Sequence, residues 1–302
     1  MGAQFRDAGI DSAALDAKLL ILAVTGWSET DLILRADEAL MPADIDALDG
    51  CASRRLSGEP IDHILGYRDF YGRRFHVTKD VLSPRQETEA LVELVLNLSG
   101  NLKDPSFLDL GTGSGAIAIS LLAERADATG LAVDVSDAAL GIAKDNASRH
   151  NVGERLRLAC GSWFEPVTGQ FDIIVSNPPY IKELEGREGV HDQADSFEPH
   201  LALYLPDDEY DKWYEVFFSH ALNSLKDEGA LMIEGHEDCL LHLKEIALKY
   251  FAKVVLKTTT GNNKEEIISI IQNIKGEGMT AGATGMKLAY RHARNNFVTF
   301  AF

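Results

Sequence analysis

An alternation of strand-like and helix-like segments from residue 106 onward constrains the fold of this chain most strongly. Short apolar runs such as 107–110 and 171–175 are typical of strands buried in a parallel sheet. Parallel strands are connected by crossover helices, so the alternation predicts an α/β fold with a parallel central sheet. The expected strands cover 107–110, 131–135, 155–158, 171–175 and 230–234, with an antiparallel pair at 254–256 and 267–271 joined through 261–263. The expected helices cover 116–122, 137–150, 213–225 and 240–250.

The loop that follows the first of these strands, 111–115, has the sequence Gly-Thr-Gly-Ser-Gly. Glycines let the chain turn sharply and let a ligand approach the backbone. The dinucleotide fingerprint G-x-G-x-x-G would need its third glycine at Ala116, although it tolerates alanine there, so the spacing favours S-adenosylmethionine. Asp134 ends the next strand, where a carboxylate can accept hydrogen bonds from ribose hydroxyls in either cofactor. Asp109, inside the first strand, either fixes the glycine loop or contacts the methionine amino group, and we favour the first interpretation.

A polar residue and two prolines, Asn177-Pro178-Pro179, followed by Tyr180, come directly after the strand at 171–175. Prolines have no backbone N–H to donate, so this turn presents mainly carbonyl acceptors, to which the Asn177 side chain adds one more. Such acceptors suit a substrate that carries an NH2 group, and Tyr180 offers a flat face to pack on it. An Asn-Pro turn can also simply close a strand. Together with the glycine loop, the motif favours methyl transfer to an amino or amide nitrogen, whereas hydride transfer has no evident use for it.

The chain before residue 100 has a different character. Three helices are expected between 11 and 58, followed by a β-hairpin over 64–77 with its turn near Gly72. The pattern of a sheet ends near residue 275. We therefore expect a helical N-terminal domain over 1–60 for substrate recognition, a β-hairpin linker over 61–82, a methyltransferase domain over 83–274 and a tail of unknown role over 275–302.

Charge and cysteine content exclude several other classes. The 47 acidic and 29 basic residues give a formal net charge of −18, which argues against a surface that neutralises phosphates, so we expect no stable nucleic-acid binding. Three separated cysteines (Cys51, Cys160 and Cys239) predict neither a disulfide framework nor a metal site. No apolar run approaches the ~18 residues of a membrane span, and the N-terminus does not resemble a signal peptide. We therefore expect a cytoplasmic protein. We further expect it to act as a monomer.

Several motifs, taken in order from about residue 10 to 272, resemble those of the protein-(glutamine-N5) methyltransferases that modify peptide-chain release factors. Asn-Pro-Pro-Tyr alone is shared with other amino-methyltransferases, and the helical N-terminal unit with the segment 84–89 makes the resemblance more specific. The matching segments are Gly58-Glu59-Pro60, Ile64-Leu65-Gly66, Pro84-Arg85 with Glu87-Thr88-Glu89, 108–118, Val133-Asp134, 163–166, 176–181 and Phe197-Glu198-Pro199.

The resemblance implies a class I (Rossmann-like) methyltransferase fold with a seven-stranded sheet and a small helical N-terminal domain. It implies S-adenosyl-L-methionine as the cofactor and a class I release factor, offering a glutamine from a Gly-Gly-Gln loop, as the partner. Asn177 and Pro178 would hold the target amide, with Pro179 beside them and Tyr180 packing on it, so that Asn177, Pro178 and Tyr180 are the expected catalytic residues. The implied cofactor-binding residues are Gly111, Thr112, Gly113, Ser114 and Gly115 at the methionine end, Asp134 at the ribose, Trp163 against the adenine, and Asn177.

The chain departs from the family pattern at three positions. Ser162 stands where the family usually has an acid able to accept from the adenine amino group, Gln86 replaces a proline, and Ser196 replaces a common arginine. Three alternative functions remain at this point. The chain could methylate an exocyclic amine of DNA or RNA, with Tyr180 stacking on a flipped base. It could bind the cofactor without catalysis, for which Ser162 is the best argument, or it could be a nicotinamide oxidoreductase.

Overall fold

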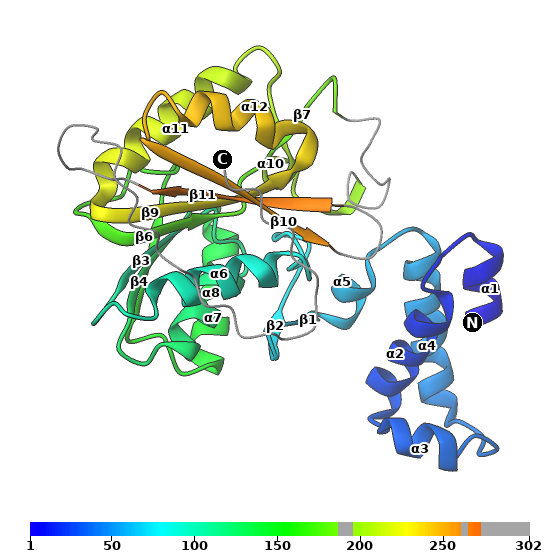
Figure 1. Ribbon diagram of the computed structural model, residues 1–302. Coiled ribbons are helices and arrows are strands. Elements are labelled where there is room, and N and C mark those ends of the chain that lie inside the picture. Colours follow the sequence, from blue (N-terminus) through cyan, green and yellow to red (C-terminus); the bar gives the residue numbers. More distant parts are fainter. Residues whose placement is uncertain (187–195, 261–264, 273–302) are drawn as a thin grey trace.

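A central sheet with the strand order β10-β11-β9-β6-β3-β4-β5 carries the site. The computed structural model describes residues 1–186, 196–260 and 265–272 (Figure 1). The parallel part of the sheet contains β3 (Ser106–Leu110), β4 (Thr129–Asp134), β5 (Leu156–Cys160), β6 (Phe171–Ser176) and β9 (Leu225–His236). At one edge β11 (Glu265–Gln272) runs antiparallel to β9, and β10 (Lys253–Thr260) runs antiparallel to β11.

Helices cover both faces of this sheet (Figure 1). The alternation of side chains along a strand explains why, because Phe107 joins the core on one face and Leu108 the core on the other. One face is covered by α6 (Thr88–Ser99), α7 (Ala116–Glu124) and α8 (Asp137–Arg149), and the other by α11 (Tyr210–Ser224) and α12 (Glu237–Ala247). The predicted α/β fold with a parallel central sheet is therefore confirmed.

Some boundaries differ from those predicted. The strand expected at 230–234 begins earlier, at Leu225. The polar residues 226–229 resemble a turn, but they form an irregularity within β9, which pairs with β6 on either side of them. Glu228 there has a positive φ of 63°. The helix expected at 240–250 spans Glu237–Ala247 instead. The predicted connection 261–263 and the predicted tail 275–302 lie outside the described residues.

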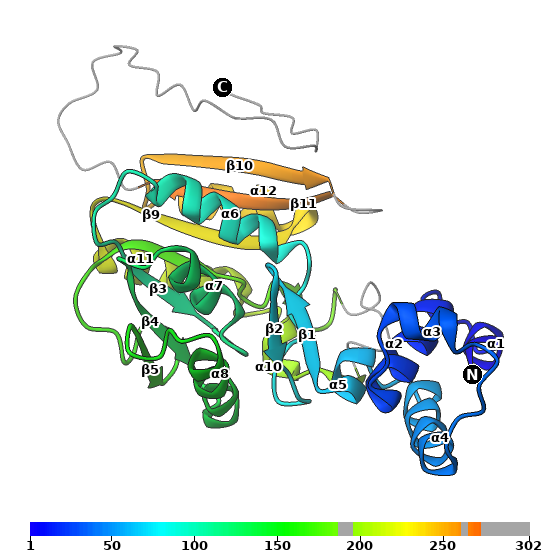
Figure 2. The ribbon, with the colours of Figure 1, turned by 90° about the horizontal axis from the view of Figure 1, so that it is seen from below.

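The N-terminal helices pack around their own core, which includes Phe5, Leu20 and Leu48. Figures 1 and 2 show them to one side of the sheet, connected to it through a short helix and a hairpin. These elements are α1 (Gly2–Asp7), α2 (Ala13–Thr25), α3 (Glu29–Leu34), α4 (Pro42–Leu56), α5 (Ile61–Leu65), β1 (Tyr67–Phe70) and β2 (Arg73–His76).

The small helical N-terminal unit is thus confirmed. The hairpin is present, but its first strand begins at Tyr67 and not at residue 64, because the left-handed Gly66 ends α5 first. No helix in the described part of the chain is long and apolar enough to cross a membrane.

A buried ion pair fixes α4 against α2. The Arg55 Nε lies 2.7 Å from the Asp16 Oδ2, and the two side chains are only 8% and 2% exposed. A second Arg55 nitrogen donates to the Glu59 carbonyl at 3.1 Å. Removing one partner of such a pair leaves an uncompensated buried charge, which costs far more than losing a surface pair.

We therefore expect Arg55→Leu to lower the free energy of unfolding of the N-terminal domain by about 3–5 kcal/mol. Urea unfolding, followed by a probe in the N-terminal helices, measures this change. The exposed pair Lys18–Glu29 provides the control, since Glu29→Ala should cost less than about 1 kcal/mol. Equal effects of the two substitutions would contradict the assignment of Arg55 as a buried anchor.

Candidate active site

The glycine loop between β3 and α7 has a backbone that only glycines adopt easily. Gly111, Gly113 and Gly115 have φ values of 69°, 54° and 82°. At Gly115 a Cβ atom would also lie only 2.7 Å from the Cδ1 of Ile119. The loop therefore folds tightly against α7 and leaves its backbone close to the space beyond the carboxyl end of the sheet.

Asp109 holds this loop from beneath. Its Oδ2 accepts hydrogen bonds from the Thr112 hydroxyl at 2.7 Å and from the Ala118 backbone N–H at 3.2 Å. Burial raises the pKa of Asp109 to about 6, although those two hydrogen bonds act in the opposite direction. These contacts fit the interpretation that Asp109 fixes the loop.

Asp134 connects the glycine loop to the end of the next strand. One carboxylate oxygen accepts from the Gly113 N–H at 2.8 Å and the other from the Ser136 N–H at 2.9 Å. Ser136 in turn caps α8 by accepting from the Ala139 N–H. The acidic side chain therefore lies beside the loop, at the carboxyl edge of the sheet.

Asn177 lies directly beyond β6, where the neighbouring strand β9 supplies a partner. Its side-chain nitrogen donates to the Glu234 Oε1 at 3.0 Å and to the Thr88 hydroxyl at 3.4 Å. Glu234 is only 4% exposed and Thr88 only 5%. Because the nitrogen faces these groups, the Asn177 side-chain oxygen is left to face away from them.

Two carbonyls of the Pro-Pro-Tyr turn already accept a hydrogen bond from a buried side chain. The Tyr214 hydroxyl donates to the Pro179 carbonyl at 3.1 Å, and the Tyr210 hydroxyl donates to the Tyr180 carbonyl at 3.0 Å. Both tyrosines are buried on α11. The hydrogen bonds among the described residues include none to the Pro178 carbonyl. Of the expected acceptors, the Pro178 carbonyl and the Asn177 side-chain oxygen are therefore those that receive no hydrogen bond from the described residues.

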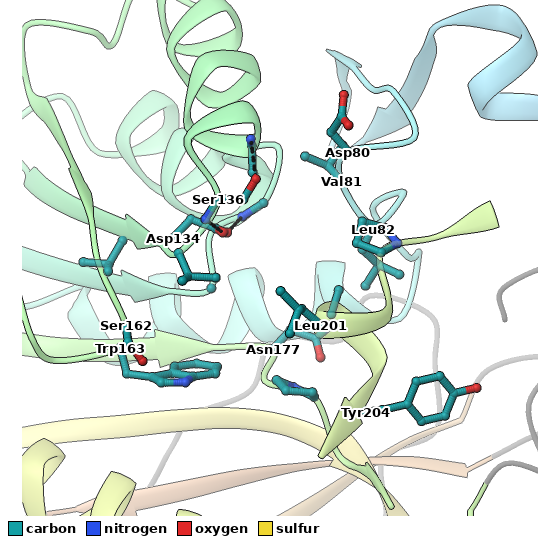
Figure 3. A pocket seen from close by; sticks show the side chains of 18 of the residues that line it. Asp80, Val81, Leu82, Asp134, Ser136, Ser162, Trp163, Asn177, Leu201 and Tyr204 are labelled. Atoms are coloured by element: carbon teal, nitrogen blue, oxygen red, sulfur yellow. Dashed lines mark hydrogen bonds between the residues drawn. The ribbon is translucent and has the colours of Figure 1, made fainter. Parts of the chain in front are cut away.

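A pocket of about 550 Å³ joins the glycine loop to the Asn-Pro-Pro-Tyr turn. In Figure 3, Asp134 and Trp163 lie on one side of it and Leu82 and Tyr204 on the other, with Asn177 between them. Of the predicted site residues, the pocket is lined by Gly111, Gly113, Asp134, Trp163, Asn177 and Pro179, and not by Thr112, Ser114, Gly115, Pro178 or Tyr180.

Trp163 stands at the end of the pocket opposite the turn. Its ring would lie 3.6 Å from a Cβ on Gly111, and it meets Trp213 edge-on with ring centroids 4.7 Å apart. Ser162 also lines the pocket, and its backbone N–H donates to Glu165. An aromatic ring and a neutral hydroxyl therefore form this end.

The segment that follows residue 196 forms one wall of the pocket and is held by an ion pair to Arg85, which precedes α6. Pro199, Leu201 and Tyr204 line the pocket. The buried Glu198 pairs with Arg85, with 2.5 Å between Oε2 and Nη2. Burial raises the pKa of Glu198, although the charge of Arg85 acts in the opposite direction.

Phe197 extends this connection, because a Cβ on Gly58 at the end of the N-terminal helices would lie 3.2 Å from its ring. Three motifs that are far apart in the sequence, 58–60, 84–89 and 197–199, therefore meet.

Known proteins match both parts of the chain. The model of the PrmC N-terminal domain matches residues 2–66, and that of the methyltransferase small domain matches residues 75–194. A release factor glutamine methyltransferase of Cereibacter sphaeroides is 40% identical over 229 residues, which cover 75% of this chain and 80% of that protein. The chain belongs to the release factor glutamine methyltransferase family. The resemblance predicted from the motifs is confirmed.

Two further comparisons concern a longer relative and a solved structure of low sequence identity. A bifunctional methyltransferase of Rickettsia typhi is 37% identical over 245 residues, but the chain spans about half of that relative, 47% of its length. Among solved structures, the hMettl16 catalytic domain in complex with an RNA hairpin has a TM-score of 0.57 at 15% identity, covering 79% of this chain and 84% of that one. At this identity the likeness shows the fold alone.

The family and its fold imply S-adenosyl-L-methionine as the cofactor, and the pocket fits it. An open glycine backbone, a carboxylate and an indole ring border one continuous space. The described residues contain no cluster of groups that could hold a metal ion. Sequence reasoning missed Glu234, Tyr210 and Tyr214, and the only signal for Glu234 was an acid at the end of an apolar strand next to β6.

The pH dependence of the free energy of unfolding tests the role of Asp109 beneath the glycine loop. Its folded-state pKa is raised, so it stabilises the fold at low pH, and this stability is lost as pH rises from about 4 to about 6. Relative to Asp109→Asn, the wild type should lose about 2 kcal/mol of unfolding free energy between pH 4.5 and 7.5. Denaturant unfolding of both proteins at each pH measures the difference.

Asp127 supplies the matched control, because its Arg125 partner lowers its pKa to about 2. Stability from that group is lost only as pH falls well below 4.5, so Asp127→Asn should leave the slope in the same window unchanged. A wild-type slope equal to that of Asp109→Asn would contradict the burial of a titrating carboxyl under the loop.

Proposed function

We propose that the chain transfers a methyl group from S-adenosyl-L-methionine to the side-chain amide nitrogen of a glutamine in a class I release factor. The observation that carries this proposal is the orientation of Asn177, whose nitrogen donates to Glu234 while its oxygen is left for a substrate N–H. The Pro178 carbonyl is the second acceptor. Membership of the family supports glutamine as the bearer of the NH2 group.

A glutamine amide nitrogen is a poor nucleophile because its lone pair is delocalised into the carbonyl. The Asn177 oxygen and the Pro178 carbonyl would each accept one N–H of the amide and hold the nitrogen in line with the methyl group. Orientation of this kind can supply up to ~7–11 kcal/mol of the barrier. Acceptors aimed at the nitrogen also stabilise the positive charge that grows there as the new bond forms.

The bound cofactor supplies an electrophilic methyl group on a positively charged sulfur. Gly111 and Gly113 would lie along its methionine end, Asp134 would accept from its ribose hydroxyls and Trp163 would flank its adenine. Thr112, Ser114 and Gly115 would shape the loop, and Asn177 would border the methyl group. The amide nitrogen would form a bond to the methyl carbon as the sulfur–carbon bond breaks, the electron pair of that bond would remain on sulfur, and the nitrogen would then release a proton to solvent.

The remaining parts of the chain have proposed roles as well. The helical domain over 1–60 would recognise the release factor, the linker over 61–82 would join it to the methyltransferase domain over 83–274, and Tyr180 would pack on the target amide. The role of the tail over 275–302 is open. We further propose that the protein acts as a monomer in the cytoplasm without stable nucleic-acid binding, in keeping with its charge of −18.

Asn177→Ala should lower kcat for methylation of a release factor by about 100- to 1,000-fold, the usual cost of removing one group that stabilises transition-state charge. The Kd for cofactor should change little. Mass spectrometry of the Gly-Gly-Gln peptide measures turnover, and calorimetry with S-adenosylhomocysteine measures binding.

A release factor with its glutamine replaced by alanine is the substrate control. Wild-type turnover in Asn177→Ala, or transfer of tritiated methyl to DNA or RNA in place of the release factor, would contradict the proposal.

Ser162 provides a separate test of the adenine end. Ser162→Asp would replace a neutral acceptor by a charged one, and hydrogen bonds to charged groups are stronger by about 1 kcal/mol or more. We expect the Kd for S-adenosylhomocysteine to tighten about 5-fold, while Ser162→Ala should weaken it slightly. An unchanged Kd in both variants would indicate that the adenine does not lie against this residue.

A further inference from the structure

We infer that Glu234 is a positioning residue that sets which end of the Asn177 side chain faces the substrate. The register of the sheet brings the two residues together. β6 and β9 pair in parallel with Ser176 opposite Ile233, so Asn177 and Glu234 follow at equivalent positions on neighbouring strands. Their side chains meet at 3.0 Å, between the Asn177 nitrogen and the Glu234 Oε1. The inference rests on the proposed function.

A primary amide fits a site of this shape either way round, because its oxygen and its NH2 group are similar in size. The two orientations differ in chemistry. One presents an acceptor to the pocket and the other presents donors. A glutamine NH2 group brings only donors, so it can bind productively only when the Asn177 oxygen faces it.

The Glu234 Oε1 removes this ambiguity, because it accepts from the Asn177 nitrogen and a carboxyl oxygen without a proton has nothing to donate to a turned Asn177 oxygen. Turning the Asn177 amide around would point its oxygen at the Glu234 oxygen. No hydrogen would then lie between the two oxygens, and the hydrogen bond would be lost. The second contact of Asn177, the Thr88 hydroxyl, is longer at 3.4 Å and can either donate or accept. It therefore cannot decide the orientation by itself.

The position of Glu234 is also rigid. Glu234 pairs with Ile268 of β11, and the preceding Ile233 pairs with Ser176 of β6 on the other side. The strand is therefore held at both edges. The side chain is 4% exposed, which strengthens its hydrogen bonds relative to those in water. A fixed, buried acceptor behind Asn177 fits a residue that positions its neighbour without touching the substrate.

The experiment compares two variants of similar length. Glu234→Met removes the acceptor, so one N–H of Asn177 stays unsatisfied unless the amide turns around, and kcat for release-factor methylation should fall about 10-fold or more. Glu234→Gln can accept the same hydrogen bond or, with its own amide turned, donate to a turned Asn177 oxygen, so its kcat should fall between those of wild type and Glu234→Met. Both variants should bind S-adenosylhomocysteine with the wild-type Kd.

A double-mutant cycle separates positioning from a general structural role. In the Asn177→Ala background, Glu234→Met should change kcat by less than about 2-fold, because the residue through which Glu234 acts is already gone. A full additional loss in that background would overturn the inference. So would wild-type turnover in Glu234→Met, while the proposed function would still stand. Wild-type turnover in Asn177→Ala would overturn the proposed function itself.

A measurement on the wild-type protein covers the case in which Glu234→Met does not fold. In nuclear magnetic resonance spectra, the Asn177 side-chain NH2 protons should exchange slowly with water and show close contacts to the side-chain protons of Glu234 and Thr88. An NH2 group that exchanges as fast as that of an exposed asparagine would overturn the inference.

Discussion

The pairing of β6 with β9 is the constraint on which the rest of the site depends. It sets Asn177 beside Glu234 at the carboxyl edge of the sheet, with 3.0 Å between the side-chain nitrogen and the carboxylate. The same edge holds the glycine loop after β3 and Asp134 after β4, because parallel strands end together. The pocket beside the glycine loop and the proposed acceptor for an NH2 group therefore lie side by side at this edge.

Hydrogen bonds from buried groups make this edge rigid. Tyr210 and Tyr214 occupy the carbonyls of Tyr180 and Pro179, and Asp109 fixes the glycine loop through Thr112. Each of these two carbonyls has therefore used part of its capacity to accept hydrogen bonds. The Asn-Pro-Pro-Tyr turn presents fewer unoccupied acceptors than its sequence suggests.

Much of the fold could be predicted from the sequence because the physical signals are local. Apolar runs predicted the parallel strands, and the spacing of Gly111, Gly113 and Gly115 predicted a tight loop, which their positive φ values confirm. Prediction was weaker where neighbouring strands override local polarity. Lys226 and the polar residues after it resemble a turn, yet they lie within β9 because β6 pairs with that strand on both sides of them, at Leu225 and from Ala230 onward. The left-handed Gly66 similarly ends a helix where a strand was expected.

The sequence by itself determined that the chain is an α/β protein with a glycine loop, an acid at the end of the next strand and an Asn-Pro-Pro-Tyr turn, since each is written in adjacent residues. Only the tertiary structure decided which acceptors stay available and which acid stands behind Asn177. Glu234 is 57 positions away along the chain but adjacent across the sheet. Arg85 and Glu198 likewise meet across 113 positions. The first contact depends on strand order and register and the second on the packing of two loop segments, and no local pattern of residues specifies either.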